Sequence, residues 1–126
     1  MTKKNILIVE DDKDLRESWE MFFNNFGVDV HTVTNGMEAK EIINQYPLEI
    51  ILTDIQMPLK DGYFVLEYAK SQRIDTKVWA CSGQLFTKNV PENKYHFDKI
   101  LTKPFDMLNV VEEIISITSE NNANKT

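Results

Sequence analysis

Charged and polar side chains follow four of the apolar runs in this sequence. Three carboxylates come after the first run, a fourth comes after a later run, and a hydroxyl and an ammonium group come after two others. In chain order these residues are Glu10, Asp11, Asp12, Asp54, Ser82 and Lys103. If the runs are parallel strands, their carboxyl ends meet at one edge of a sheet, where ligands bind in open α/β folds. The sequence therefore predicts one polar site built from several strands.

Three carboxylates at one edge create a repulsion that predicts a cation. If the first and third runs form neighbouring strands, Glu10, Asp11 and Asp54 crowd together. Two unit charges ~4 Å apart repel by about 4 kcal/mol at an effective dielectric of ~20, so such a cluster must hold a proton or a metal ion. Oxygen ligands in an open, hydrated site favour Mg²⁺, or Mn²⁺, over zinc, and the sequence has no grouping of His or Cys that suggests otherwise. Lys103 adds a positive group at the same edge.

Each of these residues, taken singly, has a structural alternative. Asp11 or Asp12 could cap the first helix, and we assign Asp12 mainly to that role. Lys103 alone would be a surface lysine, and Ser82 alone would be a cap or turn residue. Lys103 precedes Pro104, which favours extended backbone at the lysine and suits a proline that opens the last helix. The functional hypothesis therefore depends on the combination.

Apolar runs alternate with amphipathic stretches along the chain, which is the pattern of a repeated β-α unit. The runs lie at residues 6–9, 28–33, 48–52, 78–81 and 100–101. Strands this uniformly apolar suit a parallel sheet covered on both faces, and right-handed crossovers then place helices on both sides. We therefore expect a doubly wound α/β domain over residues 1–119, followed by a polar, disordered tail at residues 120–126.

The first and last helices are each predicted from an apolar stripe. The stripe of the first helix consists of Leu15, Trp19, Phe22 and Phe26. The stripe of the last helix, within residues 105–118, consists of Leu108, Val111, Ile114 and Ile115. Gly27 is expected to end the first helix as a left-handed cap.

Two further helices are predicted from their boundary residues. One spans residues 37–46 and stops before Pro47, and the other spans residues 63–71 with Asp61 as its capping candidate. The segment after Ser82 is less regular, because Pro91 lies in its middle. Either a helix begins near Pro91, or this region is short and mobile.

Composition narrows the functional classes. At 126 residues the chain is about one domain long, and its single cysteine, Cys81, lies in an apolar run, so we expect it to be buried in a reducing compartment. No apolar stretch approaches the ~20 residues of a membrane span, which predicts a soluble, cytoplasmic protein with no membrane partner. A net charge of −6 argues against direct binding to nucleic acid.

Four motifs together resemble the receiver domain of two-component response regulators, of the single-domain, chemotaxis-regulator-like type. The motifs are "ILIVEDD", "LTDIQMPLKDG", "VWACSG" and "ILTKPF", in the family's order and spacing over residues 4–118. The resemblance implies a flavodoxin-like receiver fold with strand order 2-1-3-4-5. It also implies that Asp54 accepts a phosphoryl group from a phosphohistidine of a sensor histidine kinase or a histidine phosphotransfer protein, and so signals to an unknown downstream protein.

The resemblance also implies a metal site. Asp11 and Asp54 would hold Mg²⁺, or Mn²⁺, directly, the backbone carbonyl of Gln56 would add a third oxygen, and Glu10 would act through water.

The remaining implied roles concern the phosphoryl group. Lys103 would pair with Asp54 before the reaction and with the phosphoryl group after it, and Ser82 would donate a hydrogen bond to a phosphoryl oxygen. Gln56 and Gln84 stand where the family tunes hydrolysis by water. Such a protein catalyses its own phosphorylation and dephosphorylation but is mainly a signalling switch.

The sequence departs from the family on the output side. The aromatic switch residue usually found three positions before the site lysine is replaced by Ile100, and "KYHFDK" replaces the usual small residues. Aromatic rotation cannot occur at Ile100, so coupling would use Ser82 with Phe97, Tyr95 or a reordered helix. We expect His96 to be a surface or interface histidine, and we expect His31 to lie on a strand surface.

Several readings of function compete. The favoured one is a stand-alone phosphorylatable receiver, because the chain begins with Met1 and ends in a polar tail. A receiver module of a longer hybrid kinase or transcriptional regulator is an alternative, as is a pseudo-receiver that binds partners without phosphorylation. Two other classes are disfavoured. A haloacid-dehalogenase phosphatase would need a second Asp where Gln56 stands. A flavodoxin-like electron carrier would need a phosphate-binding loop after the first strand, where "EDDKD" would repel the flavin phosphate.

Overall fold

The computed structural model describes residues 5–57, 59–83 and 95–123, which form a five-stranded sheet covered by helices. The strands are β1 (Asn5–Val9), β2 (Asp29–Val33), β3 (Ile50–Asp54), β4 (Lys77–Ser82) and β5 (Lys99–Thr102). They are ordered β2-β1-β3-β4-β5, and every neighbouring pair is parallel. The predicted doubly wound α/β fold with order 2-1-3-4-5 is confirmed.

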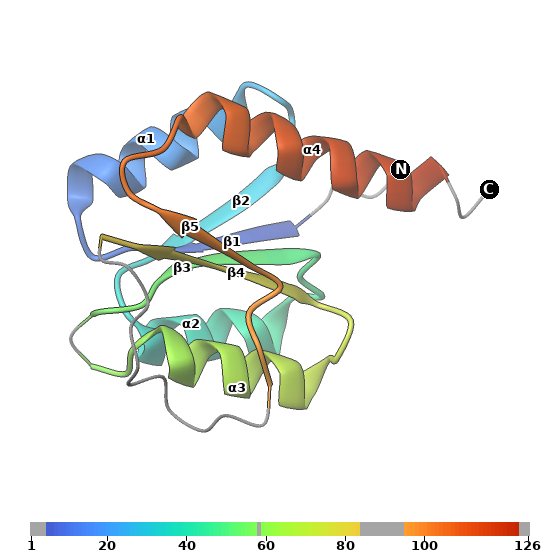
Figure 1. The fold of residues 1–126 in the computed structure, drawn as a ribbon. Helices are drawn as coiled ribbons and strands as arrows, with labels where there is room; N and C mark the ends of the chain where they lie inside the picture. Colours follow the sequence, from blue (N-terminus) through green and yellow to red (C-terminus); the bar gives the residue numbers. More distant parts are fainter. Residues whose placement is uncertain (1–4, 58, 84–94, 124–126) are drawn as a thin grey trace.

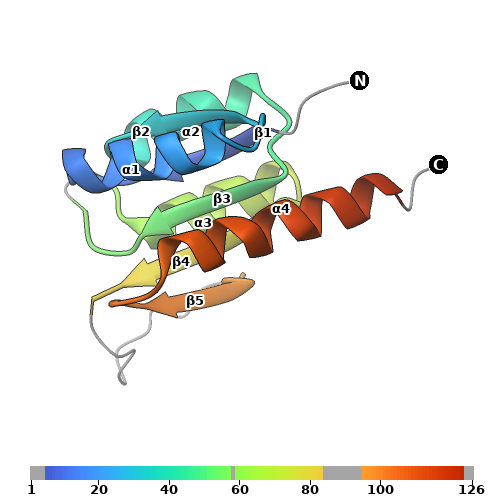
Figure 2. The ribbon, with the colours of Figure 1, turned by 90° about the horizontal axis from the view of Figure 1, so that it is seen from above.

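In the described part of the chain, two helices cover each face of the sheet. The helices are α1 (Lys13–Asn24), α2 (Gly36–Gln45), α3 (Gly62–Gln72) and α4 (Met107–Ala123). Helices α1 and α4 lie on one face and α2 and α3 on the other (Figure 1), and the view from above in Figure 2 shows α1 and α4 on the same side of the strands. The bounds of α2 and α3 agree with the sequence prediction to within one residue.

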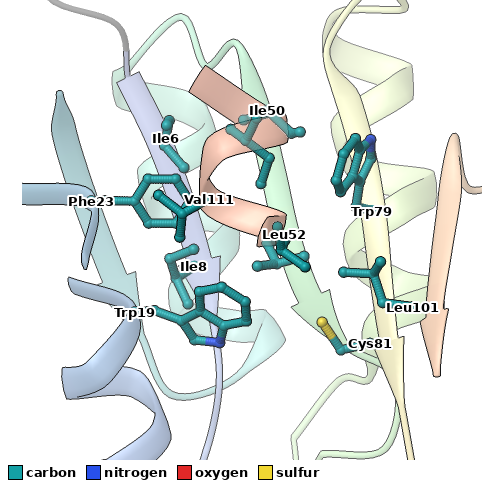
Figure 3. Close-up of a cluster of buried hydrophobic side chains, with 12 residues drawn as sticks. Ile6, Ile8, Trp19, Phe23, Ile50, Leu52, Trp79, Cys81, Leu101 and Val111 are labelled. Atoms are coloured by element: carbon teal, nitrogen blue, oxygen red, sulfur yellow. The ribbon is translucent and has the colours of Figure 1, made fainter. Parts of the chain in front are cut away.

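Successive residues of β1 enter two separate hydrophobic cores. Ile6 and Ile8 pack with Trp19 and Phe23 in the core under α1 and α4 (Figure 3), whereas Leu7 enters the core under α2 and α3. The indole of Trp19 lies 6.2 Å from the ring of Phe23. Because both faces of the strand are buried, its residues are apolar without alternation, which is the pattern that predicted a parallel sheet.

The predicted stripe of the first helix was partly wrong. Helix α1 ends at Asn24, so Phe26 lies in the following turn and is 43% exposed, whereas Phe23, which was not assigned to the stripe, is fully buried. Gly27 has the expected positive φ of 73°, but it closes the turn after the helix and is not the helix cap itself. The chain leaves helical geometry one residue too early for Phe26 to reach the core.

The last helix begins later than predicted. Pro104 does not open it, because α4 starts at Met107 and its first turn is capped by the Asp106 side chain, which accepts from the amides of Leu108 and Asn109 at 3.0 and 3.3 Å. Leu108 is consequently 43% exposed.

The far end of the last helix also differs from the prediction. Helix α4 continues to Ala123, beyond the expected end at residue 118 and into the stretch expected to be a disordered tail. The domain boundary at residue 119 stays a prediction. Pro91, near which one of the two alternatives places the start of a helix, lies outside the described residues.

Two residues of the strands test the expectations about burial. Cys81 is 4% exposed, as predicted, and burial, with the nearby Asp54 carboxylate adding to it, raises the pKa of its thiol, so the thiol stays protonated. His31 was expected on a strand surface, but its ring stacks on Tyr46 at 4.2 Å and its Nε2 atom is buried. The aromatic ring at the end of α2 covers the edge strand there.

Candidate functional site

The three predicted carboxylates meet at the carboxyl edge of the sheet. Glu10 follows β1 and Asp54 ends the neighbouring strand β3, and one carboxylate oxygen from each of Glu10, Asp11 and Asp54 lies within 4.8 Å of the others. Glu10 and Asp54 are only 3% and 8% exposed, whereas Asp11 is exposed to solvent. The site is therefore a buried carboxylate pair with one open side.

Lys103 faces the same cluster. Its Nζ lies 3.1 Å from Oδ1 of Asp54, and its backbone N–H donates to the carbonyl of Ser82 at 2.8 Å. Burial alone would lower the pKa of Lys103, but attraction to Asp54 and the hydrogen bond with that carboxylate together raise it. The lysine is therefore a fixed positive charge beside Asp54.

Burial, together with the neighbouring Asp54 carboxylate, favours the protonated form of Glu10 and raises its pKa. Burial raises the pKa of Glu10 to about 8, and its hydrogen bond to Asp54 adds to the shift. The backbone N–H of Asp12, 3.1 Å from Oε2 of Glu10, and the charge of Lys103 oppose that rise without cancelling it. A buried all-oxygen group that holds a proton at neutral pH is chemically suited to a hard divalent cation, which would replace that proton.

Asp12 and Arg16 fix the backbone on the open side of the cluster. The Asp12 side chain accepts from the Leu15 amide at 3.0 Å, so Asp12 caps α1 as predicted. The guanidinium of Arg16 donates to the carbonyls of Glu10 and Asp11 at 3.0 and 3.4 Å. Arg16 was not predicted from the sequence. Its contact with the Glu10 carbonyl, six residues earlier, depends on the angle between β1 and α1.

The loop after Asp54 is closed at its base by glycine. The Gly62 amide donates to the Ile55 carbonyl at 2.9 Å, and the Ile55 amide donates to the Cys81 carbonyl at 3.2 Å. A Cβ atom at Gly62 would lie 2.4 Å from the backbone oxygen of Asp54. Asp61 caps α3, as predicted, by accepting from the first amides of the helix. Only glycine allows α3 to start this close to the Asp54 backbone.

The tip of the same loop has strained backbone. Leu59 and Lys60 have φ values of 53° and 67°, in the left-handed region that non-glycine residues rarely occupy, at roughly 1–3 kcal/mol each. Gln56, the predicted carbonyl ligand, lies on this loop with its side chain exposed. Gln84, the second predicted hydrolysis residue, lies outside the described residues.

The switch residues proposed from sequence fall in two places. Ile100 is 44% exposed on β5, and Ser82 ends the adjacent strand β4. Tyr95 and Phe97 instead pack against the core under α3, where the ring of Phe97 lies 5.5 Å from that of Tyr63.

Polar contacts hold the same segment, residues 95–98, on α3. The Tyr95 amide donates to Glu67 at 3.1 Å, and the Asp98 carboxylate accepts from Lys70 at 2.8 Å and from the Val78 amide at 2.7 Å. The segment entering β5 is thus fastened along one face of α3.

None of the helices in the described part of the chain combines the length and apolar content of a membrane span.

The sheet order β2-β1-β3-β4-β5, with Asp54 and Lys103 paired beside an acidic cluster at its carboxyl edge, is the arrangement of a receiver domain. Consistent with this, the family model of the response regulator receiver domain matches residues 6–115, and the chain belongs to this family. It is 33% identical over 112 residues to the response regulator receiver protein CpdR of Brucella abortus, an alignment that covers 88% of this chain and 93% of CpdR. It spans only between 24% and 54% of the length of three further curated relatives.

Solved structures agree on the fold. A CheY-like receiver domain from Methanospirillum hungatei is 24% identical, with a TM-score of 0.82 over 98% of this chain and 99% of that one. The response regulator TrrA from Thermotoga maritima, solved in complex with Mg²⁺-BeF, is 22% identical, with a TM-score of 0.77 over 90% of this chain and 97% of that one. At these identities the likeness shows the receiver fold.

Proposed function

We propose that Asp54 is the phosphoacceptor of this receiver domain and takes its phosphoryl group from a phosphohistidine on a sensor histidine kinase or a histidine phosphotransfer protein in the cytoplasm. The observation that carries the proposal is the 3.1 Å contact between Lys103 and the buried Asp54 carboxylate at the end of the central strand. A carboxylate in that position has a cation to balance its charge and an open side on which to meet a donor.

The proposed reaction needs one bond made and one broken. A carboxylate oxygen of Asp54 bonds to phosphorus while the bond from phosphorus to the histidine nitrogen breaks, and the leaving imidazole keeps the electron pair. Lys103 then pairs with the phosphoryl group, and Ser82 donates to one of its oxygens. These residues position and neutralise charge, which is most of what phosphoryl transfer requires of a protein.

The acidic cluster fits a divalent metal. Asp11, Asp54 and the backbone carbonyl of Gln56 would hold Mg²⁺, or Mn²⁺, and Glu10 would contact it through water. The ion, when bound, supplies positive charge to the transferred phosphoryl oxygens. The raised pKa of Glu10 supports this assignment, since the cluster already needs a positive partner. The TrrA structure supports it further, because that receiver was solved with Mg²⁺-BeF.

The proposed output uses α3 and the segment at residues 95–98. Ile100 cannot rotate as an aromatic switch would, whereas Phe97 contacts Tyr63 at the start of α3, next to Gly62 and the Asp54 backbone. A shift of Asp54 on phosphorylation would therefore reach Phe97 and Tyr95 through α3, alongside any movement of Ser82. The downstream partner is a protein that reads this surface.

The test follows intrinsic tryptophan fluorescence during addition of Mg²⁺ and then beryllofluoride, a phosphoryl mimic. Trp79 lies three residues before Ser82 with its ring under the Lys99 ammonium at 4.9 Å, so a rearrangement of β4 and β5 should alter its emission. We expect a saturable, Mg²⁺-dependent change in the parent protein and none in Asp54→Asn.

Asp75→Asn is the matched control, because Asp75 is an exposed carboxylate that precedes β4, at the opposite edge of the sheet. It should respond as the parent does. If the parent shows no change, and calorimetry detects no beryllofluoride binding, the phosphoacceptor proposal is wrong and a pseudo-receiver that binds partners without phosphorylation is favoured.

A further inference from the structure

The loop between β3 and α3 is fastened to α2 at its tip as well as closed at its base. The backbone amide of Gly36, the first residue of α2, donates to the Lys60 carbonyl at 3.1 Å. The first amides of a helix have no partner within the helix, so this contact satisfies a group that would otherwise need water. A second element of the fold therefore holds the loop that leaves Asp54.

The contact leaves no room for a side chain at residue 36. A Cβ atom there would lie 2.4 Å from the Lys60 oxygen, 2.8 Å from Lys60 Cβ and 3.0 Å from its carbonyl carbon. These are atoms of the backbone and the base of a side chain, so no rotamer change relieves the overlap. Helix propensity favours alanine over glycine at a helical position, so the glycine serves the close approach and not the helix.

The part of α2 that makes the contact is held by side-chain hydrogen bonds. Asn35 caps the helix by accepting from the Glu38 amide at 2.9 Å, and the Glu38 carboxylate reaches back to the amide and hydroxyl of Thr34, each at 2.7 Å. Because Glu38 accepts from the residue before the N-cap, these bonds tie the first turn to the preceding chain, much as a capping box does. Lys60, one of the two residues with positive φ, thus contacts a capped helix end.

We propose that Gly36 is a positioning residue for the phosphoacceptor site. It acts through the β3–α3 loop, by holding the strained tip at Lys60 so that the loop presents the Gln56 carbonyl beside Asp54. The metal part of this inference rests on the proposed function, whereas the docking of the loop on α2 does not.

The test compares Gly36→Ala with Met37→Ala, a change of the next residue in the same helical turn, whose side chain is 46% exposed. Amide hydrogen exchange is measured first in metal-free protein. The residue-36 amide should exchange at least tenfold faster in Gly36→Ala, whereas the Ala39 amide, which donates to the Asn35 carbonyl within the helix, should stay protected. Met37→Ala should match the parent at both amides.

Magnesium affinity is then measured by fluorescence titration. We expect the Mg²⁺ dissociation constant of Gly36→Ala to rise about tenfold, as is typical when a residue that orients a metal ligand without touching the metal is changed. The Mg²⁺ dissociation constant of Met37→Ala should stay at the parent value. Faster exchange at residue 36 with unchanged affinity would overturn the positioning role. If the parent itself binds no Mg²⁺, the proposed function fails, and the exchange data still decide whether Gly36 holds the loop.

The parent protein provides a test that does not depend on the variant folding. Because coupling is reciprocal, Mg²⁺ that is bound more tightly with the loop docked must also protect the Gly36 amide. Saturating Mg²⁺ should slow exchange at Gly36 and leave Ala39 unchanged. Equal exchange at Gly36 with and without Mg²⁺ would refute the inference.

Discussion

Removal of metal should make the stability of this protein fall steeply between about pH 5 and pH 8, because Glu10 keeps its proton in the folded state. Its pKa is raised from 4.5 to about 8, first by burial and then by the hydrogen bond to Asp54. Below pH 4.5 both the folded and the unfolded chain hold this proton, so Glu10 does not lower the free energy of unfolding in that range. Above that value the unfolded chain releases the proton and the folded chain does not, so unfolding becomes easier with each pH unit until the folded pKa is passed.

The magnitude follows from the size of the pKa shift. One pKa unit corresponds to about 1.4 kcal/mol, so the full shift sets an upper bound of about 5 kcal/mol on the free energy of unfolding that is lost. We expect about half of that, because Asp11 is solvent-exposed and the open side of the cluster lets water screen the charges.

The assay is urea unfolding in a metal chelator from pH 5 to pH 8.5, for the parent and for Glu10→Gln. Trp19 and Trp79 are 1% and 3% exposed, so their fluorescence reports global unfolding. Because the variant cannot titrate at residue 10, the difference between the two proteins isolates Glu10 from the other carboxylates. Saturating Mg²⁺ should flatten the slope of the parent, since the cation takes the place of the proton. Parallel pH profiles for the two proteins in chelator would refute the reasoning.

Two predictions concern close contacts made by residues of α3. Gly62→Ala should lower the free energy of unfolding by about 1–3 kcal/mol and weaken beryllofluoride binding, because the new Cβ would lie 2.4 Å from the backbone oxygen of Asp54. Unchanged beryllofluoride binding would contradict this. Asp98→Ala should destabilise the protein more than Lys70→Met in urea unfolding. It removes the carboxylate partner of the Lys70 ammonium, which is 8% exposed and keeps only the Ile74 carbonyl at 3.5 Å, and it also removes the acceptor of the Val78 amide. Lys70→Met leaves an Asp98 side chain that is 33% exposed, and the reverse order of stabilities would be contrary evidence.

The acidic site was predictable from local pattern, because parallel strands bring their carboxyl ends to one edge whatever their order. Asp54 could be predicted as a site residue because an apolar run precedes it and loop-forming residues follow it. The order of the strands could not be predicted from the apolar runs, because nothing in them shows which strand is central. That order came from the resemblance to receiver domains. The position of Glu10 beside Asp54 depends on that order, because it requires β1 and β3 to be neighbours.

Helix boundaries and close backbone contacts were not predictable in the same way. Phe22, Phe23 and Phe26 all suit an apolar stripe. The rotation of α1 about its axis buries Phe23 more fully than Phe22, and the end of the helix at Asn24 leaves Phe26 exposed. The glycine at residue 36 carries no local signal of its role, because its φ is ordinary and its constraint comes from Lys60, distant in sequence. Sequence periodicity describes which face of an element is buried but not which distant backbone approaches it.

On the output side the sequence departs from the receiver pattern, with Ile100 at a position that is usually aromatic. Three side chains of α3, spaced four and three residues apart on one helical face, hold the segment that enters β5. The pairs are Tyr63 with Phe97, Glu67 with Tyr95, and Lys70 with Asp98. Helix α3 starts at Gly62 against the Asp54 backbone, so two consecutive contacts connect Asp54, the proposed phosphoacceptor, to Phe97. We infer that these aromatic residues, absent from the usual small-residue run, take over the coupling that an aromatic side chain at position 100 would otherwise provide.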